Sequence, residues 1–177
     1  MASFVDRVVG AARLDPRIYE EVEADTTATP QAMGVVVLAA VSSGIGAATL
    51  GTTGAITTVV GALVGWVVWA ALIWLVGTKV LPEPRTKSDI GELLRTIGFA
   101  SSPGLLLVLR IIPLVGLLVG LVVWVWQLAA TVVAVRQALD YTSTGRAVLV
   151  CLIGWVVNIA VSLGIALMFG ITSVALG

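Results

Sequence analysis

An apolar stretch that runs from Pro103 to Val135 limits the possible folds of this chain more than any other feature. It is too long for one bilayer crossing, which takes about 20 helical residues. Arg110 and Pro113 interrupt it in the middle. An arginine at the bilayer centre costs at least about 2.5–3.5 kcal/mol, whereas near the membrane surface its long side chain reaches water. The stretch therefore predicts a tight helical hairpin with Arg110 and Pro113 at its apex.

The composition of the whole chain agrees with a membrane location. Of its 177 residues, 59% are hydrophobic and 11% are charged, whereas soluble domains carry about 25% charged residues. We therefore predict an all-α polytopic membrane protein with five transmembrane helices. The predicted spans are approximately residues 32–50, 55–81, 102–112, 114–136 and 146–171. They form a membrane domain over 30–177, preceded by a cytoplasmic helical segment over 1–29.

Two polar segments outside the spans also carry helix signals. In the segment 1–29, Ser3 with Asp6 resembles a helix cap, and Asp15 followed by Pro16 marks the start of a second helix. The loop 82–99 contains apolar residues at positions i, i+3, i+4 and i+7, with charged residues opposite. This pattern is typical of a helix that lies on the membrane surface. We therefore expect a short interfacial amphipathic helix within the cytoplasmic loop 82–99, over Asp89–Phe99.

The distribution of charge predicts the orientation. With five spans, nine of the ten Lys and Arg residues fall on one side of the membrane and Arg110 alone falls on the other. All ten acidic residues fall on the side of the nine. Because cytoplasmic loops carry the excess of Lys and Arg, we expect a cytoplasmic N-terminus, an outer C-terminus and a place in the plasma (inner) membrane.

Small and polar residues within the spans permit two interpretations. Gly61 and Gly65 form one GxxxG pair, and Gly116 and Gly120 form another; such pairs let helices pack closely. In one interpretation the glycines are packing sites and an amide side chain is hydrogen-bonded between helices. In the other, the same residues line a polar path for a solute. The further residues concerned are Gln127, Gly154, Asn158 and Ser162.

The chain lacks the residues that most catalytic sites need. It has no histidine, its predicted spans contain no Asp or Glu, and no P-loop, dinucleotide motif or paired-cysteine metal motif is present. We therefore expect no enzyme activity, no catalytic, cofactor-binding or metal site, and no cofactor. The six tryptophans are interpreted as interfacial anchors and packing residues, with stacking on a ligand as the alternative.

An acidic group at the end of the N-terminal segment is the candidate interaction surface. It could bind a cation or a basic partner, or it could be a solvated helix face. Its residues are Tyr19, Glu20, Glu21 and Glu23.

Four short motifs resemble the Yip domain family of Ypt/Rab-interacting membrane proteins, specifically its prokaryotic branch. They are Asp15-Pro16 with Tyr19-Glu-Glu, the segment from Glu92 to Gly104, Ile112-Pro-Leu-Val-Gly116, and the segment from Ala134 to Ala147. The resemblance implies a cytoplasmic N-terminal region followed by five spans. Eukaryotic members associate with Rab-type GTPases and with each other, in vesicle traffic or membrane shaping. This chain lacks their Asp-Leu-Tyr-Gly-Pro signature, which argues against a GTPase partner.

Together these observations predict a non-enzymatic, membrane-organising or protein-interaction role. We expect the lipid bilayer, and a second copy or another membrane protein, as partners, and no nucleic acid. The alternative function is a small-solute or ion transporter or channel subunit, with a polar path along the fourth and fifth spans.

Overall fold

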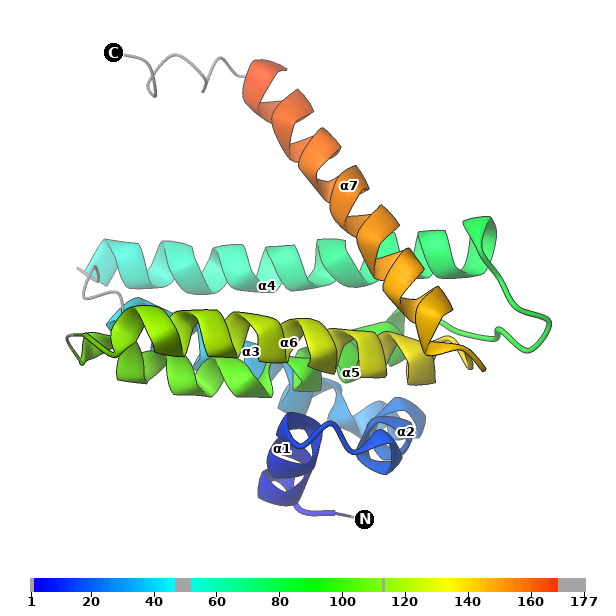
Figure 1. The fold of residues 1–177 in the computed structure, drawn as a ribbon, viewed down its shortest axis with the longest axis horizontal. Coiled ribbons are helices and arrows are strands. Elements are labelled where there is room, and N and C mark those ends of the chain that lie inside the picture. Colours follow the sequence, from blue (N-terminus) through cyan, green and yellow to red (C-terminus); the bar gives the residue numbers. More distant parts are fainter. Residues whose placement is uncertain (1, 47–51, 113, 169–177) are drawn as a thin grey trace.

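The computed structural model describes residues 2–46, 52–112 and 114–168, and these residues form helices without any strand (Figure 1). Pro113, a predicted apex residue, lies outside the described residues. The elements are α1 (Phe4–Ala12), α2 (Pro16–Ala24), the 3₁₀ turn η1 (Thr26–Ala28), α3 (Thr29–Gly46), α4 (Thr52–Leu75), the π-helical turn η2 (Val76–Val80), α5 (Ile90–Ala100), the 3₁₀ helix η3 (Ser102–Ile111), α6 (Gly116–Ala138) and α7 (Thr144–Met168).

Within the described residues, five segments are long and apolar enough to cross a membrane, which confirms the predicted number of spans. They are Thr26–Gly46, Ile56–Val80, Ile90–Ile111, Gly116–Ala138 and Thr144–Val161.

The two N-terminal helices begin at the predicted caps. Ser3 accepts a hydrogen bond from the Asp6 backbone N–H, and the Asp6 carboxylate accepts one from the Ser3 N–H, so both halves of a capping box are present. Asp15 caps α2, and Pro16 occupies its first turn. Leu14, in the left-handed region with φ 61°, makes the turn between the two helices.

The third apolar segment differs from the prediction of a surface-lying helix over 89–99. This part of the chain is α5, which is buried in the middle of the bundle: Leu93 and Phe99 are 0% exposed. With η3 it forms the segment Ile90–Ile111, which is long and apolar enough to cross a membrane and begins before the predicted residue 102. An amphipathic stripe has the same spacing whether it faces lipid or protein. Here the stripe faces α2, α3, α4 and α6.

The predicted hairpin is present between η3 and α6. Leu114, with φ 70°, adopts the left-handed conformation in the turn between Ile111 and Gly116. A Cβ at Gly116 would lie 2.5 Å from the Arg110 carbonyl oxygen, and one at Gly120 would lie 3.4 Å from the Arg110 Nε. These glycines therefore let the start of α6 pack closely against the end of η3.

The five segments differ in how much of their surface the protein itself covers. In the third segment 56% of the most apolar window is buried, but in the last only 17%. Figure 1 shows α7 leaving the other long helices at an angle towards its C-terminal end. Its contacts are with α4, η2 and α6. The bundle is therefore most compact around α5.

Candidate functional site

Most charged residues gather in one part of the molecule, which we call the charged side: α1, α2 and the loops 81–89 and 139–143. Helices α1 and α2 pack beside α5, and α2 also packs beside α6 (Figure 1). Among the described residues, every ion pair involves this side or the first turn of α7. Two candidate sites follow from the structure: this side and a cavity within the bundle.

Arg7 holds the charged side together. Its side chain is only 2% exposed, and its Nη2 lies 2.8 Å from Glu21 Oε1 and 2.7 Å from Asp25 Oδ2. Its Nη1 donates a hydrogen bond to Gln31 Oε1 at 3.1 Å. The hydrogen bond from Arg7 is the main reason why the pKa of Glu21 lies below its ordinary value. One buried guanidinium thus joins α1 and α2 to the start of α3.

Arg95 makes a second link, between α5 and α2. Arg95 is 5% exposed. Its Nε donates to the carbonyl oxygens of Val22 and Glu23 at 3.0 Å each. These carbonyls belong to the last turn of α2, where helix carbonyls lack intrahelical partners and a positive charge is favourable.

The predicted interaction surface is partly internal, which corrects that prediction. Tyr19 is 0% exposed, and its hydroxyl donates to the Ala11 carbonyl at 3.0 Å. Glu21 is bonded to Arg7, and Glu20 accepts a hydrogen bond from Gln137 Nε2 at 2.7 Å. The prediction considered the acidic residues of α2 by themselves, but the residues that bind Glu21 and Glu20 lie on α1 and α6.

Glu23 lies among other acids. Burial, the largest cause, and the neighbouring charges of Glu92, Asp140 and Glu20 together raise the pKa of Glu23 to about 7, and Arg95 acts in the opposite direction. Its carboxyl group therefore changes charge near neutral pH.

The loops of the charged side are also tied to the bundle. The Tyr141 hydroxyl donates to the carbonyl of Leu81 at 2.7 Å and to that of Gly77 at 3.0 Å. Glu83 accepts hydrogen bonds from the Thr142 N–H at 3.1 Å and its hydroxyl at 2.9 Å. Tyr141 thereby holds the π-helical turn η2 against the loop after α6.

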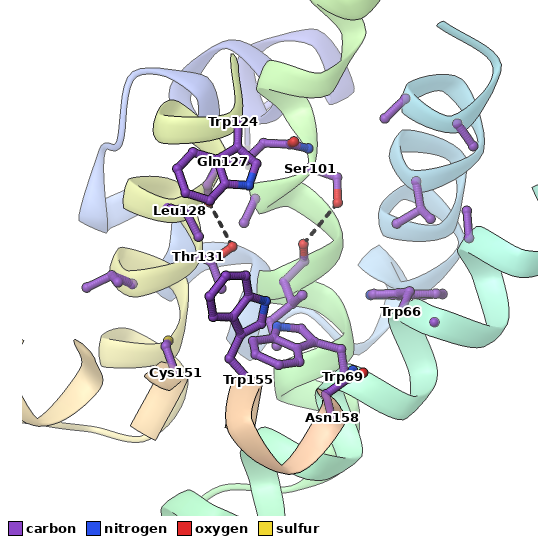
Figure 2. A pocket seen from close by; sticks show the side chains of 18 of the residues that line it. Trp66, Trp69, Ser101, Trp124, Gln127, Leu128, Thr131, Cys151, Trp155 and Asn158 are labelled. Atoms are coloured by element: carbon purple, nitrogen blue, oxygen red, sulfur yellow. Dashed lines mark hydrogen bonds between the residues drawn. The ribbon is translucent and has the colours of Figure 1, made fainter. Parts of the chain in front are cut away.

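A cavity of about 810 Å³ lies between α3, α4, α5, α6 and α7. Four tryptophans from three helices line it: Trp66 and Trp69 from α4, Trp124 from α6 and Trp155 from α7 (Figure 2). Among the described residues, no charged side chain lines this cavity.

The polar side chains of the cavity differ in their hydrogen bonds. The Thr131 hydroxyl donates to the Gln127 backbone carbonyl at 2.8 Å, and the Ser101 hydroxyl donates to the Ile97 carbonyl at 3.4 Å (Figure 2). Within the described part of the chain, the Gln127 side-chain amide has no hydrogen-bond partner. The expectation that Gln127 or Asn158 is hydrogen-bonded between helices is therefore not met by Gln127. Asn158 also lines the cavity.

The predicted packing residues have separate surroundings. A Cβ at Gly154 would lie 2.9 Å from Ile73 Cδ1, so α7 crosses α4 closely there. At Gly61 and Gly65 nothing among the described residues lies within 4 Å of such a Cβ. The predicted close packing at this pair is therefore not found between the described helices of one chain. Gly65 instead lines the cavity. The side chain of Ser162 lies outside the described part of the structure.

The sequence interpretation missed Arg7 and Arg95 as structural residues. One signal was present: each arginine lies among apolar residues that recur with helical spacing. Their partners lie 14 to 73 residues away along the chain, and nothing in the local pattern indicates them.

The apolar segments, the hairpin and the segregated charges define a multi-pass α-helical membrane protein. The family model of the Yip1 domain matches residues 20–166, from α2 to α7. The chain belongs to the Yip1 domain family. No curated protein and no solved structure matches it.

Proposed function

We propose that this protein is a non-enzymatic membrane-organising protein, acting through α1 at the surface of the plasma membrane. The observation that carries the proposal is an exposed apolar face on a rigidly fixed helix. Val5 and Val9 are 64% and 41% exposed, and Phe4 at the start of the helix is 37% exposed. Arg7 and Ala11, on the side of α1 opposite Val5 and Val9, are buried.

The fixing of α1 supports this role. A helix of nine residues is unstable alone, but α1 is held by Arg7 and by the Trp126 Nε1, which donates to the Ala12 carbonyl at 2.6 Å. A small cleft of about 300 Å³ lies between α1 and η3. It is lined by Val8 and Val9 on one side and by Leu105 and Leu106 on the other. The apolar face of α1 therefore continues the apolar surface of the spans, as expected for an interfacial helix.

The orientation is part of the proposal. The charged side carries the excess of Lys and Arg and lies in the cytoplasm, and the hairpin turn at Arg110 lies outside. The family match supports a membrane protein. We do not propose the solute path, because no observation specifically favours transport.

Curvature sorting tests the role of α1. The full-length protein would be reconstituted in giant vesicles from which narrow membrane tubes are pulled, and its density on tube and vesicle compared by fluorescence. We expect enrichment on tubes that falls at least twofold in the double variant Val5→Ser, Val9→Ser. The matched control is Val60→Ser, Val64→Ser on the exposed face of α4. Equal sorting by the wild type and the α1 variant would refute the proposal.

Cysteine labelling tests the orientation. In a Cys151→Ala background, a cysteine at Arg85 should react with impermeant reagent only in inverted vesicles. One at Arg110 should react only in intact cells or right-side-out vesicles. The reverse pattern would place the charged side outside and overturn the orientation.

A further inference from the structure

The cavity lined by the four tryptophans has the size of a ligand site. Small-molecule sites in proteins have volumes of about 300–1,000 Å³, and this cavity has about 810 Å³. On its α6 and α7 walls, Trp124 and Trp155 are 50% and 51% exposed, so the cavity is open to the side. The neighbouring outer residues Val125 and Val156 are apolar and exposed. A ligand would therefore enter from the lipid rather than from water.

The lining restricts the charge of that ligand. Since no charged side chain of the described residues lines the cavity, an ionised ligand would lose its hydration without gaining a partner. The ligand is therefore neutral. This excludes a phospholipid headgroup.

The tryptophans restrict its shape. Indole rings interact favourably with other flat unsaturated rings through stacked or edge-to-face contacts. The rings of Trp69, Trp124 and Trp155 come from α4, α6 and α7 and lie around one space in Figure 2. A flat ring gains more from this lining than a saturated chain does.

Gln127 supplies the polar contact. It lies midway along α6, and a Cβ at Gly104 would come within 2.8 Å of its Nε2, so the missing side chain at Gly104 makes room for the amide. Among the described residues this amide has no hydrogen-bond partner, and it lines the cavity. Since no buried side-chain nitrogen or oxygen of the described residues lacks a partner, this amide is accessible in the cavity, and a carbonyl oxygen on the ligand accepts its N–H.

We infer that this cavity binds a neutral, lipid-soluble ring compound with carbonyl oxygens, of the quinone class, with a ring carbonyl on Gln127. The apolar tail of such a compound leaves through the side opening between α6 and α7. This binding is independent of the proposed role of α1, because none of the cavity residues belongs to that helix.

Quenching of tryptophan fluorescence by decylubiquinone tests the inference. The full-length protein in lipid nanodiscs would be titrated, with quinone expressed as a mole fraction of lipid. We expect saturable quenching with one site per chain. Decylbenzene has a ring and the same tail but no carbonyl, and it should not displace the quinone at an equal mole fraction.

Two pairs of variants locate the site. Gly65→Leu fills the cavity from α4, and Gly61→Leu is its control, because a Cβ at either position meets nothing within 4 Å and only Gly65 lines the cavity. Gln127→Leu removes the amide, and Gln137→Leu is its control on the same helix, at the charged side. We expect about tenfold weaker binding in Gln127→Leu, which loses the hydrogen bond to the ring carbonyl. We expect at least as large a loss in Gly65→Leu, whose side chain occupies the space of the ligand. Circular dichroism and a thermal midpoint confirm that each variant folds.

Three results would overturn the inference. Linear quenching that is equal in all variants would show quinone dissolved in lipid only. Saturable quenching that survives Gly65→Leu would place the site elsewhere. Displacement of quinone by decylbenzene would show a cavity for any apolar chain and no carbonyl recognition.

Discussion

The charged side and the cavity side of this protein are held by different kinds of contact. On the charged side, Arg7, Arg95 and Tyr141 each make directed hydrogen bonds to groups on other elements. Around the cavity, the walls are mainly apolar, and α7 diverges from the bundle beyond its crossing with α4 at Gly154.

The difference follows from the surroundings of each part. Lipid gives no hydrophobic drive for helices to associate, so close packing of small residues and polar contacts must hold them. Where polar contacts are abundant, the helices are fixed; where they are few, space remains for another molecule. The charged side therefore positions α1, and the cavity side accommodates a ligand.

The largest expected effect comes from Arg7. The change Arg7→Met leaves Glu21 and Asp25 without their buried partner, so we expect a loss of about 3–5 kcal/mol in the free energy of opening α1 and α2. Amide hydrogen exchange of α2 measures it. The control is Arg17→Met, because Arg17 is 86% exposed in its pair with Asp15, and solvent-exposed ion pairs contribute little to stability. Equal losses in Arg7→Met and Arg17→Met would show that the buried ion pairs of Arg7 do not hold the charged side together.

The second effect tests close packing. A Cβ at Gly98 would lie 2.7 Å from Ala32 Cβ and 3.2 Å from the Ala32 backbone, at the contact of α5 with α3. We expect Gly98→Ala to lower the unfolding free energy by about 1–3 kcal/mol, measured by denaturation in detergent. Gly61→Ala meets open space and should be neutral or slightly stabilising. If both changes are neutral, the packing around α5 is looser than described.

The third effect concerns the loops. Tyr141→Phe removes the one hydroxyl proton that is shared between the carbonyls of Gly77 and Leu81, and we expect a loss of about 1–1.5 kcal/mol. Tyr19→Phe removes a hydrogen bond to a single carbonyl, that of Ala11, and should lose no more than this. Thermal unfolding compares the two variants, and a larger loss for Tyr19→Phe would contradict the assigned role of Tyr141.

The smallest effect is a dependence on pH. The pKa of Glu23 rises from its ordinary value of 4.5 to about 7 in the folded protein. Between these values the folded chain binds a proton that the unfolded chain does not, so stability falls as pH rises from about 4.5 to 7. Glu23→Gln should remove this slope, as measured by thermal midpoints across that range. An unchanged slope would assign the titration to another group.

Local sequence patterns accounted for much of the fold. The caps at Ser3 and Asp15, the number of apolar segments and the hairpin near Arg110 all follow from composition and spacing, and the structure has them. These features depend on contacts within a few residues or on the preference of a whole segment for lipid. Such properties can be read from the chain itself.

The cavity was foreseen only in part. Gln127 and Asn158 were predicted either to pack between helices or to line a polar path, and both line the cavity. That four tryptophans would surround the same space did not follow from their positions, because they lie on three helices whose relative angles depend on packing. For the same reason Gly65, which was predicted as a packing residue, instead lines the cavity.

The sequence by itself determined the number of apolar helices, the caps of the N-terminal helices and which segments carry charge, because these depend on local spacing and on transfer between water and lipid. Only the tertiary structure decided what each amphipathic face contacts. The stripe on α5 could have faced lipid, but it faces the bundle, and Arg95 there bonds to Val22, 73 positions earlier in the chain. Helical spacing of apolar residues indicates that one face of a helix is apolar. Whether lipid or another helix covers that face depends on how distant segments pack.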